Sequence, residues 1–294
     1  MTAVRIRVRV PYRLDLTVEA LRRLSANVVD VVTPDGWYMR AFATPNAGTN
    51  VARVRQVTPH EIEVRMGREG ARKILPYVEQ MLGVHVDLHE WYQRAKYYRW
   101  LSAVSYRLRG LKPPRYPQLW EAICHGIVFQ QLSIVAAAAI MQRLVLECSN
   151  PVEHYGTSLY PFPPPRAILS ARSARLRMAG LSGMKASYLK NAAEAVATGA
   201  LRPQRIAALP TPAAASELMK LEGIGPWSAA VILLRGLGRL DAFPRNDSGA
   251  ARSIRVVSGN DRIDIHRVLS KLGDMRGMLY FHLLLGRRLA GEVT

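Results

Sequence analysis

Residues 221–249, LEGIGPWSAAVILLRGLGRLDAFPRNDSG, are the most informative segment of this chain for predicting its fold. Gly223 and Gly225 lie in a short break between two helical patterns, where the backbone must turn tightly. Pro226 suits the first position of a helix, because its missing amide hydrogen would have no partner there. The stretch therefore predicts two helices joined by a glycine hairpin, with Gly225 as the cap of the second helix.

The start of the second helix is a candidate anion site. Its free backbone amides and the positive end of its dipole are expected to face solvent. Such an end binds a phosphate without a basic side chain, so it can hold a nucleic-acid backbone of any sequence. An ordinary helical hairpin without a ligand is the alternative interpretation.

The charge of the chain favours a polyanionic partner. Its 294 residues include 41 Lys and Arg and 22 Asp and Glu, which gives a formal net charge of +19. The positive side chains repel one another unless a polyanion binds nearby. The longest apolar run, residues 134–141, is too short to span a bilayer. With no lipidation or export signal in view, we expect a nucleic-acid partner, no membrane, and a cytoplasmic, nucleoid-associated protein.

Two domains are expected. Over residues 1–90, an alternating strand (RIRVRV, 5–10), a helix that Thr17 can cap, four short β-rich runs and a closing helix predict an α+β domain, an antiparallel sheet with two helices. Over residues 91–294 the β pattern disappears, and Ala- and Leu-rich amphipathic segments predict an all-α domain. Within it, Ser133 is expected to cap a helix over 134–147, which places Gln130 and Gln131 at a helix junction.

The helical half resembles the HhH-GPD superfamily of DNA glycosylases, which excise damaged bases. LEGIGPW (221–227) resembles the family's helix-hairpin-helix, and DAFPRND (241–247) resembles its Gly/Pro-rich loop. WEAICHGIVFQQLSIVAAAA (120–139) resembles the helix pair before the residue that invades the DNA duplex, and residues 162–196 resemble the middle helices. VVDVVTPDGWYMRAF (28–42) resembles the extra α+β domain of the 3-methyladenine DNA glycosylase II branch, which is the closest branch on these motifs.

The resemblance implies a chemistry for Asp247, which falls where the family has its catalytic aspartate. A positioned carboxylate can stabilise the positive charge that develops on the sugar and orient the attacking water. A plain helix cap is the alternative for an Asp before Ser248. Trp227 stands where strand-cutting members carry a Schiff-base lysine, so a monofunctional enzyme that uses water is expected.

The resemblance also implies the DNA contacts. Gln131 matches the residue that fills the gap left by an extruded base, although a glutamine at a helix end is an ordinary feature. Backbone contacts are expected from the hairpin and the start of its second helix, that is, from Gly223, Ile224, Gly225 and Ser228. The expected partner is double-stranded DNA with a damaged base, bound by a monomer. A non-catalytic DNA-binding module that kept the hairpin is the alternative from another class.

The base pocket departs from the family pattern. Alkylation-repair members line it with aromatic rings, for stacking and cation–π contact, and Trp227 matches one of these. Val231, Ser248 and Met275 stand at three positions where an aromatic is usual. Trp37 and Tyr38 of the first domain are candidates for a wall, with a place in the core as the alternative. Alkylated purines are therefore the first expected substrate, and hypoxanthine, uracil or 8-oxoguanine stay open.

No cofactor is expected for catalysis. The chain has two cysteines, Cys124 and Cys148, too few for the iron–sulfur cluster of the endonuclease III branch. The resemblance does imply a structural Na⁺ or K⁺ at the hairpin, held by the main-chain carbonyls of Met219, Leu221 and Ile224.

Overall fold

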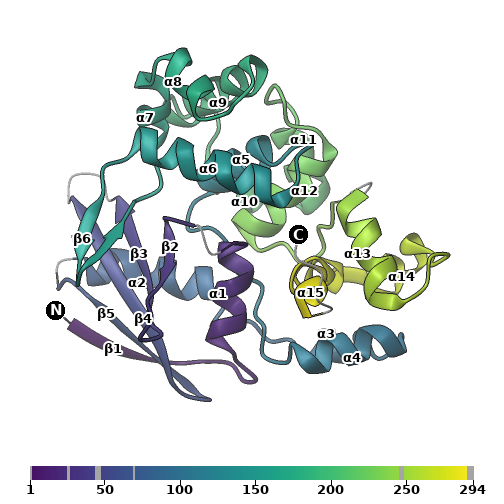
Figure 1. The fold of residues 1–294 in the computed structure, drawn as a ribbon. Coiled ribbons are helices and arrows are strands. Elements are labelled where there is room, and N and C mark those ends of the chain that lie inside the picture. The colour runs from purple at the N-terminus through teal and green to yellow at the C-terminus, as the bar shows by residue number, and fades with distance from the viewer. Residues whose placement is uncertain (1, 25–26, 44–47, 69, 245–247, 290–294) are drawn as a thin grey trace.

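A computed structural model describes residues 2–24, 27–43, 48–68, 70–244 and 248–289 (Figure 1). Asp247 lies outside these ranges, so its predicted role is not tested by the geometry. Within them, none of the helices combines the length and the apolar character needed to cross a bilayer.

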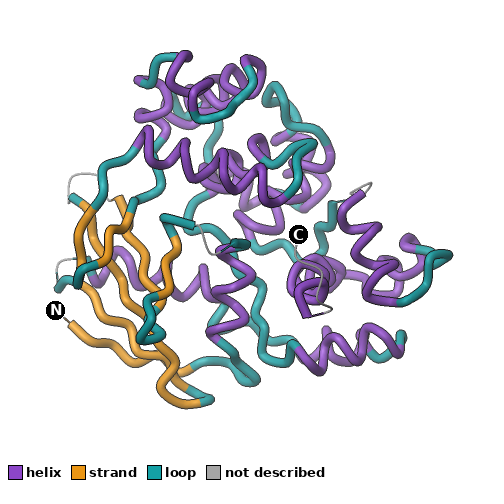
Figure 2. The backbone as a smooth tube through the Cα atoms, viewed as in Figure 1, coloured by secondary structure: helices purple, strands orange, loops and turns teal. Residues whose placement is uncertain are grey.

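The N-terminal part is an antiparallel sheet with two helices, as the sequence predicts. Its strands run in the order β1 (Thr2–Arg7), β5 (Glu61–Met66), β4 (Thr49–Thr58), β3 (Tyr38–Ala43), β2 (Asp30–Val32). Helix α1 (Leu14–Arg22) follows β1, and α2 (Ala71–Leu82) closes the unit. Figure 2 shows the strands of this sheet gathered on one side of the molecule.

Two details of this part differ from the sequence prediction. Strand β1 ends at Arg7, three residues before the predicted end of the strand at Val10, and Val10 is 44% exposed. Thr17 lies inside α1, where its hydroxyl donates to the carbonyl of Arg13 at 2.8 Å, and does not cap the helix. Helix α1 begins earlier, at Leu14, because the Gln56 side chain of β4 accepts a hydrogen bond from the Leu14 amide at 2.9 Å.

The rest of the chain is largely helical. Helices α5 and α12 pack against each other in its core, and α9 packs on α5. The helices are α3 (His89–Ala95), α4 (Arg99–Arg107), α5 (Leu119–Val128), α6 (Ile134–Cys148), α7 (Pro165–Ser170), α8 (Ser173–Met178), α9 (Gly183–Ala197), α10 (Pro203–Ala208), α11 (Thr211–Leu218), α12 (Pro226–Leu237), α13 (Ser248–Ser258), α14 (Ile265–Leu272), a 3₁₀ turn (Gly273–Met275) and α15 (Arg276–Leu289).

The expectation of an all-α second domain is wrong in one place. Strands β6 (Val152–His154) and β7 (Thr157–Leu159) form a hairpin whose turn residues, Tyr155 and Gly156, both have positive φ. Strand β7 packs against β3, and Leu159 is buried in a cluster with Trp37 and Met39. The hairpin buries its apolar side chain on the other part of the molecule, which the local pattern cannot show.

One large cluster of buried apolar side chains runs through both parts of the chain. Helix α3 begins at His89 and packs against α14, so it belongs with the helical part. The division of the sequence at residue 90 stays a prediction about organisation. Helices α1 and α15 contact each other within this shared core.

Candidate nucleic-acid interface

The glycine hairpin has the predicted geometry. Helix α11 ends at Leu218, α12 begins at Pro226, and Gly225 caps α12 in an extended conformation. Gly223 has φ of +81°, in the left-handed region that favours glycine. A Cβ at Gly223 would stand 2.2 Å from the Cδ2 atom of Tyr188, so the hairpin also approaches α9 too closely for a side chain.

The start of α12 is open. Gly225 and Pro226 are exposed, and no described atom lies within 4 Å of where a Gly225 Cβ would stand. Gly225, the cap residue, has no side chain that could cover the first turn of α12. The positive end of the α12 dipole therefore faces solvent at Gly225, a placement that suits an anion.

The hairpin carbonyls fit the expected cation site. The Leu221 carbonyl accepts a hydrogen bond from the Ile224 amide at 3.0 Å. Over the described ranges, no backbone amide donates to the carbonyls of Met219 or Ile224. Neutral oxygen ligands of this kind suit a hard cation.

A cavity of about 690 Å³ lies between the hairpin and two other elements. Residues 219–225 form one side, the loop between α5 and α6 forms a second, and the start of α9 forms the third. The loop supplies Gln130 and Gln131, and α9 supplies Met184, Lys185 and Tyr188. The cavity thus joins the predicted phosphate site to the predicted wedge residue.

Gln131 lies at the exposed tip of the α5–α6 loop. Its φ of +54° is in the left-handed region, which a residue with a Cβ adopts only when its surroundings impose it. The Ser133 hydroxyl accepts from the Ala136 amide at 3.1 Å, so the predicted cap of α6 is confirmed. An exposed side chain on a constrained loop is suited to enter a base stack.

Gln130 ties this loop to the hairpin, a role that the sequence did not reveal. Its Nε2 donates to the Gly223 carbonyl at 2.6 Å and to the Ser228 hydroxyl at 2.7 Å. Ser228, predicted to contact DNA, is 1% exposed, and its hydroxyl donates to the Gly126 carbonyl at 2.9 Å. The structure thus gives the Ser228 side chain an internal role. The only sequence signal was the position of Gln130 beside the wedge candidate.

Lys185 holds the same loop from the side of α9. Its Nζ donates to the carbonyls of Val128 at 2.9 Å and of Gln130 at 2.7 Å, which lie at the C-terminal end of α5. Burial lowers the pKa of Lys185. No spacing rule pairs a lysine with carbonyls more than fifty residues away, so the sequence could not show this contact.

The predicted pocket residues fall in different environments. Trp227 is half-buried in the first turn of α12, whereas Val231 and Met275 are buried at 1% and 7% exposure. Ser248 begins α13, and its side chain lies outside the description. Their contribution to a base pocket stays a prediction.

Trp37 and Tyr38 have partners within the N-terminal sheet region. The guanidinium of Arg53 stacks 4.5 Å from the Trp37 ring centroid, on the sheet face that β7 covers. The Tyr38 hydroxyl donates to Asp30 at 2.7 Å. Neither residue lines the cavity at the hairpin, and both are buried. This placement supports the core interpretation and gives no support to a pocket wall.

Other aromatic rings line the junction of the two parts of the chain. Arg23 at the end of α1 places its guanidinium 4.2 Å from the Phe129 ring centroid and donates to the Tyr280 hydroxyl at 3.2 Å. His125 stacks on Tyr116 with centroids 4.3 Å apart. Burial, together with the neighbouring guanidinium groups, holds the pKa of His125 well below its usual value. The cavity here measures about 30 Å³, room for about one water molecule.

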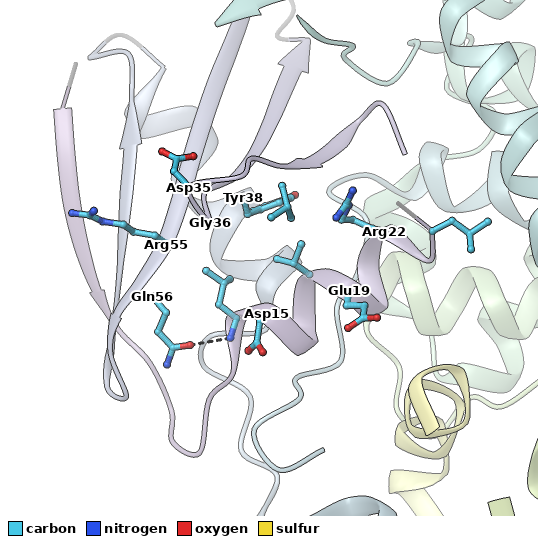
Figure 3. Close-up of a pocket in the computed structure, with 12 residues that line it drawn as sticks. Asp15, Glu19, Arg22, Asp35, Gly36, Tyr38, Arg55 and Gln56 are labelled. Carbon is cyan, nitrogen blue, oxygen red and sulfur yellow. Dashed lines mark hydrogen bonds between the residues drawn. The ribbon is translucent and has the colours of Figure 1, made fainter. Parts of the chain in front are cut away.

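A third cavity lies in the N-terminal part, between α1 and the sheet (Figure 3). Its volume is about 570 Å³, and Asp15, Glu19, Asp35, Arg22 and Arg55 contribute charged groups to its wall. It shares no lining residue with the cavity at the hairpin. The described residues contain no group of three His, Cys, Asp or Glu side chains that could hold a metal ion.

Comparison with known proteins gives one family. The protein-family model described as "HhH-GPD superfamily base excision DNA repair protein" matches residues 124–274, about half of the chain. A DNA-3-methyladenine glycosylase of Bacillus subtilis is 28% identical over 190 residues, which span 65% of this chain and 63% of that protein.

Solved structures share the fold. The 3-methyladenine DNA-glycosylase from Archaeoglobus fulgidus superposes with a TM-score of 0.81 at 24% identity, over 99% of this chain and 100% of that one. The 8-oxoguanine glycosylase/lyase of Clostridium acetobutylicum, in complex with double-stranded DNA, gives 0.76 at 16% identity, over 96% and 93%.

Proposed function

Because the chain belongs to the HhH-GPD superfamily of base excision DNA repair proteins, we propose that it is a monofunctional DNA glycosylase. It hydrolyses the N-glycosidic bond of damaged bases in double-stranded DNA, and alkylated purines come first among them. The observation that carries the proposal is the cavity that joins the exposed Gln131 to the open start of α12. A phosphate contact and a wedge side by side are what base extrusion needs.

Asp247 is the proposed catalytic carboxylate. It follows α12 and directly precedes α13. As the sugar of the extruded nucleotide gains positive charge, the carboxylate stabilises that charge and orients the attacking water. The C–N bond breaks and its electron pair leaves with the base. The water oxygen bonds to the sugar carbon, its proton passes to the Asp247 carboxylate, and an abasic site remains.

Water is the proposed nucleophile. Trp227 has no amine, and the Lys185 amine donates to two carbonyls of the α5–α6 loop. A lysine must reach the sugar to form a Schiff base. We therefore expect base release without strand cleavage.

We also propose a structural ion, an oligomeric state and a cellular location. Na⁺ or K⁺ would be held by the carbonyls of Met219, Leu221 and Ile224, where its charge attracts a DNA phosphate. Catalysis would need no metal and no iron–sulfur cluster. The protein would act as a monomer in the cytoplasm, associated with the nucleoid.

A second candidate keeps the enzyme class and changes the lesion. By the resemblance, Val231 and Met275 stand where the alkylation-repair branch is expected to carry aromatics, and both are buried side chains without a ring. A pocket with fewer π-faces attracts a cationic purine less strongly. Hypoxanthine, uracil or 8-oxoguanine are the alternative substrates.

Base release separates these candidates. Duplex oligonucleotides with one alkylated, deaminated or oxidised base are incubated with the protein or with Asp247→Asn, and abasic sites are then revealed with alkali. We expect alkali-dependent breaks with the wild type and a loss of at least about a hundredfold in the variant. Breaks without alkali would refute the monofunctional assignment. Binding without release from any lesion would favour a non-catalytic module.

A further inference from the structure

The structure assigns to Gln130 and Lys185 a positioning role: they lock the Gln131 loop to the phosphate-binding hairpin, so that the duplex is gripped and wedged by one rigid unit. This inference rests on the proposed function and deepens it, because it names the contacts that allow the wedge to push against DNA.

The first lock is a chain of hydrogen bonds across three segments. Gln130 donates both amide hydrogens, one to the Gly223 carbonyl at 2.6 Å and one to Ser228 at 2.7 Å. The Ser228 hydroxyl in turn donates to the Gly126 carbonyl at 2.9 Å, inside α5. The wedge loop, the hairpin and the start of α12 therefore share one network.

The second lock comes from α9. The Lys185 ammonium bonds the carbonyls of Val128 and Gln130, which would otherwise be open at the end of α5. One turn further along α9, the Tyr188 ring lies so close to Gly223 that a Cβ there would stand 2.2 Å from it. Helix α9 thus contacts the wedge loop and the hairpin at once.

The locks explain how Gln131 can hold its conformation. A residue with a Cβ at φ of +54° on an exposed tip would relax to a more favourable backbone unless its neighbours fixed it. Gln130 is fixed through its side chain and through its carbonyl, directly before Gln131. A wedge must also withstand the base stack it opens, which an unsupported loop would not.

The test compares one lesion in two duplexes. In the first it stands opposite its normal partner, and in the second it stands opposite an abasic-site analogue, where extrusion breaks no base pair. Gln130→Met keeps the length of the side chain and removes both donors. The matched control is Gln93→Met, at an exposed glutamine of α3.

Gln130→Met is expected to slow single-turnover release of the paired lesion about tenfold, because the half-buried Gly223 carbonyl loses its donor. Release opposite the abasic analogue should slow less than about threefold, because little unstacking is required there. Lys185→Met should show the same split, and Gln93→Met should show none. Fluorescence of 2-aminopurine beside the lesion should rise less with Gln130→Met than with the wild type.

Equal slowing in both duplexes would assign Gln130 a merely structural or a catalytic role and overturn the inference. An unchanged rate in both would overturn it as well. If the wild type released no base from any lesion, the proposed function would fail instead, while the 2-aminopurine signal would still report whether Gln130 controls unstacking.

Discussion

Gly223 must be a glycine both because of its backbone conformation and because helix α9 lies so close to it. Its φ of +81° and its contact with Tyr188 each exclude a side chain. Gly225, two residues on, is extended and has open space where a Cβ would stand. The two glycines of the hairpin therefore serve different purposes: the first permits a turn against α9, and the second leaves the helix start uncovered.

Gly223→Ala should lower the free energy of unfolding by about 1–3 kcal/mol, from strain at positive φ and the clash with Tyr188. It should also weaken duplex binding, since the hairpin must shift. Urea denaturation and a binding titration with undamaged duplex measure both effects. Gly225→Ala is the matched control, with a loss of stability below about 1 kcal/mol. Equal losses in the two variants would contradict this account.

His282 is a residue that makes stability depend on pH. It is buried in α15, its ring centroid is 4.5 Å from that of Trp91, and burial lowers its pKa to about 4. Because the pKa of an unfolded histidine is about 6.5, the unfolded chain takes up a proton first as pH falls. The stability contributed by neutral His282 is complete above about pH 6.5 and is lost between pH 6.5 and 4.

Urea denaturation at pH 7 and pH 4.5 tests this sign. The wild type should lose about 2–3 kcal/mol through His282 alone over that interval, and His125 acts in the same direction. His282→Phe should lose correspondingly less, because phenylalanine does not titrate. The exposed His266 provides the control, and His266→Phe should keep the pH dependence of the wild type. A steeper loss in His282→Phe would reverse the argument.

Among the elements, α6 shows how a local signal fixes the position of the wedge loop. The Ser133 cap ends the loop two residues after Gln131 and begins α6 at Ile134. Sequence spacing predicted this start correctly, because an N-cap bond involves only neighbours in the chain. The β6–β7 hairpin is the opposite case, since its buried side chain meets strand β3 more than a hundred residues earlier.

Ser133→Ala should reduce the free energy of unfolding by about 1 kcal/mol, because the Ala136 amide loses its acceptor. Thermal and urea denaturation are the measurements. Ser216→Ala is the control: this exposed hydroxyl donates to a carbonyl inside α11 and caps nothing. A stability equal to that of the wild type after Ser133→Ala would show that the cap is dispensable.

Across the whole molecule, the N-terminal sheet and the helical part are joined by a buried ionic group. Arg40 of β3 is 1% exposed and bonds Asp30 of β2 at 2.7 Å and Glu121 of α5. Burial raises the pKa of Glu121, and Arg40 opposes that change. The Tyr38 hydroxyl completes the set through Asp30. The arginine thus compensates the charges of two buried carboxylates.

Arg40→Met should lower the free energy of unfolding by about 3–5 kcal/mol, because it leaves buried charge unpaired. Urea denaturation measures the loss. Arg175→Met removes an arginine that pairs with Glu147 at the surface at 3.0 Å, and it should change stability by less than about 1 kcal/mol. Equal effects of the two substitutions would show that burial of the ionic group contributes nothing.

The net charge of +19 is a property of the whole molecule that should make its binding to DNA depend on salt. Binding to an undamaged duplex should weaken steeply as salt rises, because each neutralised phosphate releases counterions. A titration series in increasing salt, plotted as log affinity against log salt, gives the slope. An affinity that does not change with salt would contradict a phosphate contact as the basis of binding.

Local patterns were enough to predict the strands and the two helices of the N-terminal part, the glycine hairpin and the cap at Ser133, because each of these depends on residues close together in the chain. The same patterns carried the resemblance to the family. The folded chain was needed to show that Gln130 and Lys185 hold the Gln131 loop, that Ser228 faces inward, and that Trp37 and Tyr38 have core partners. A hydrogen bond between residues more than ninety positions apart leaves no periodic pattern in the sequence. It forms only once packing has brought the two segments within reach.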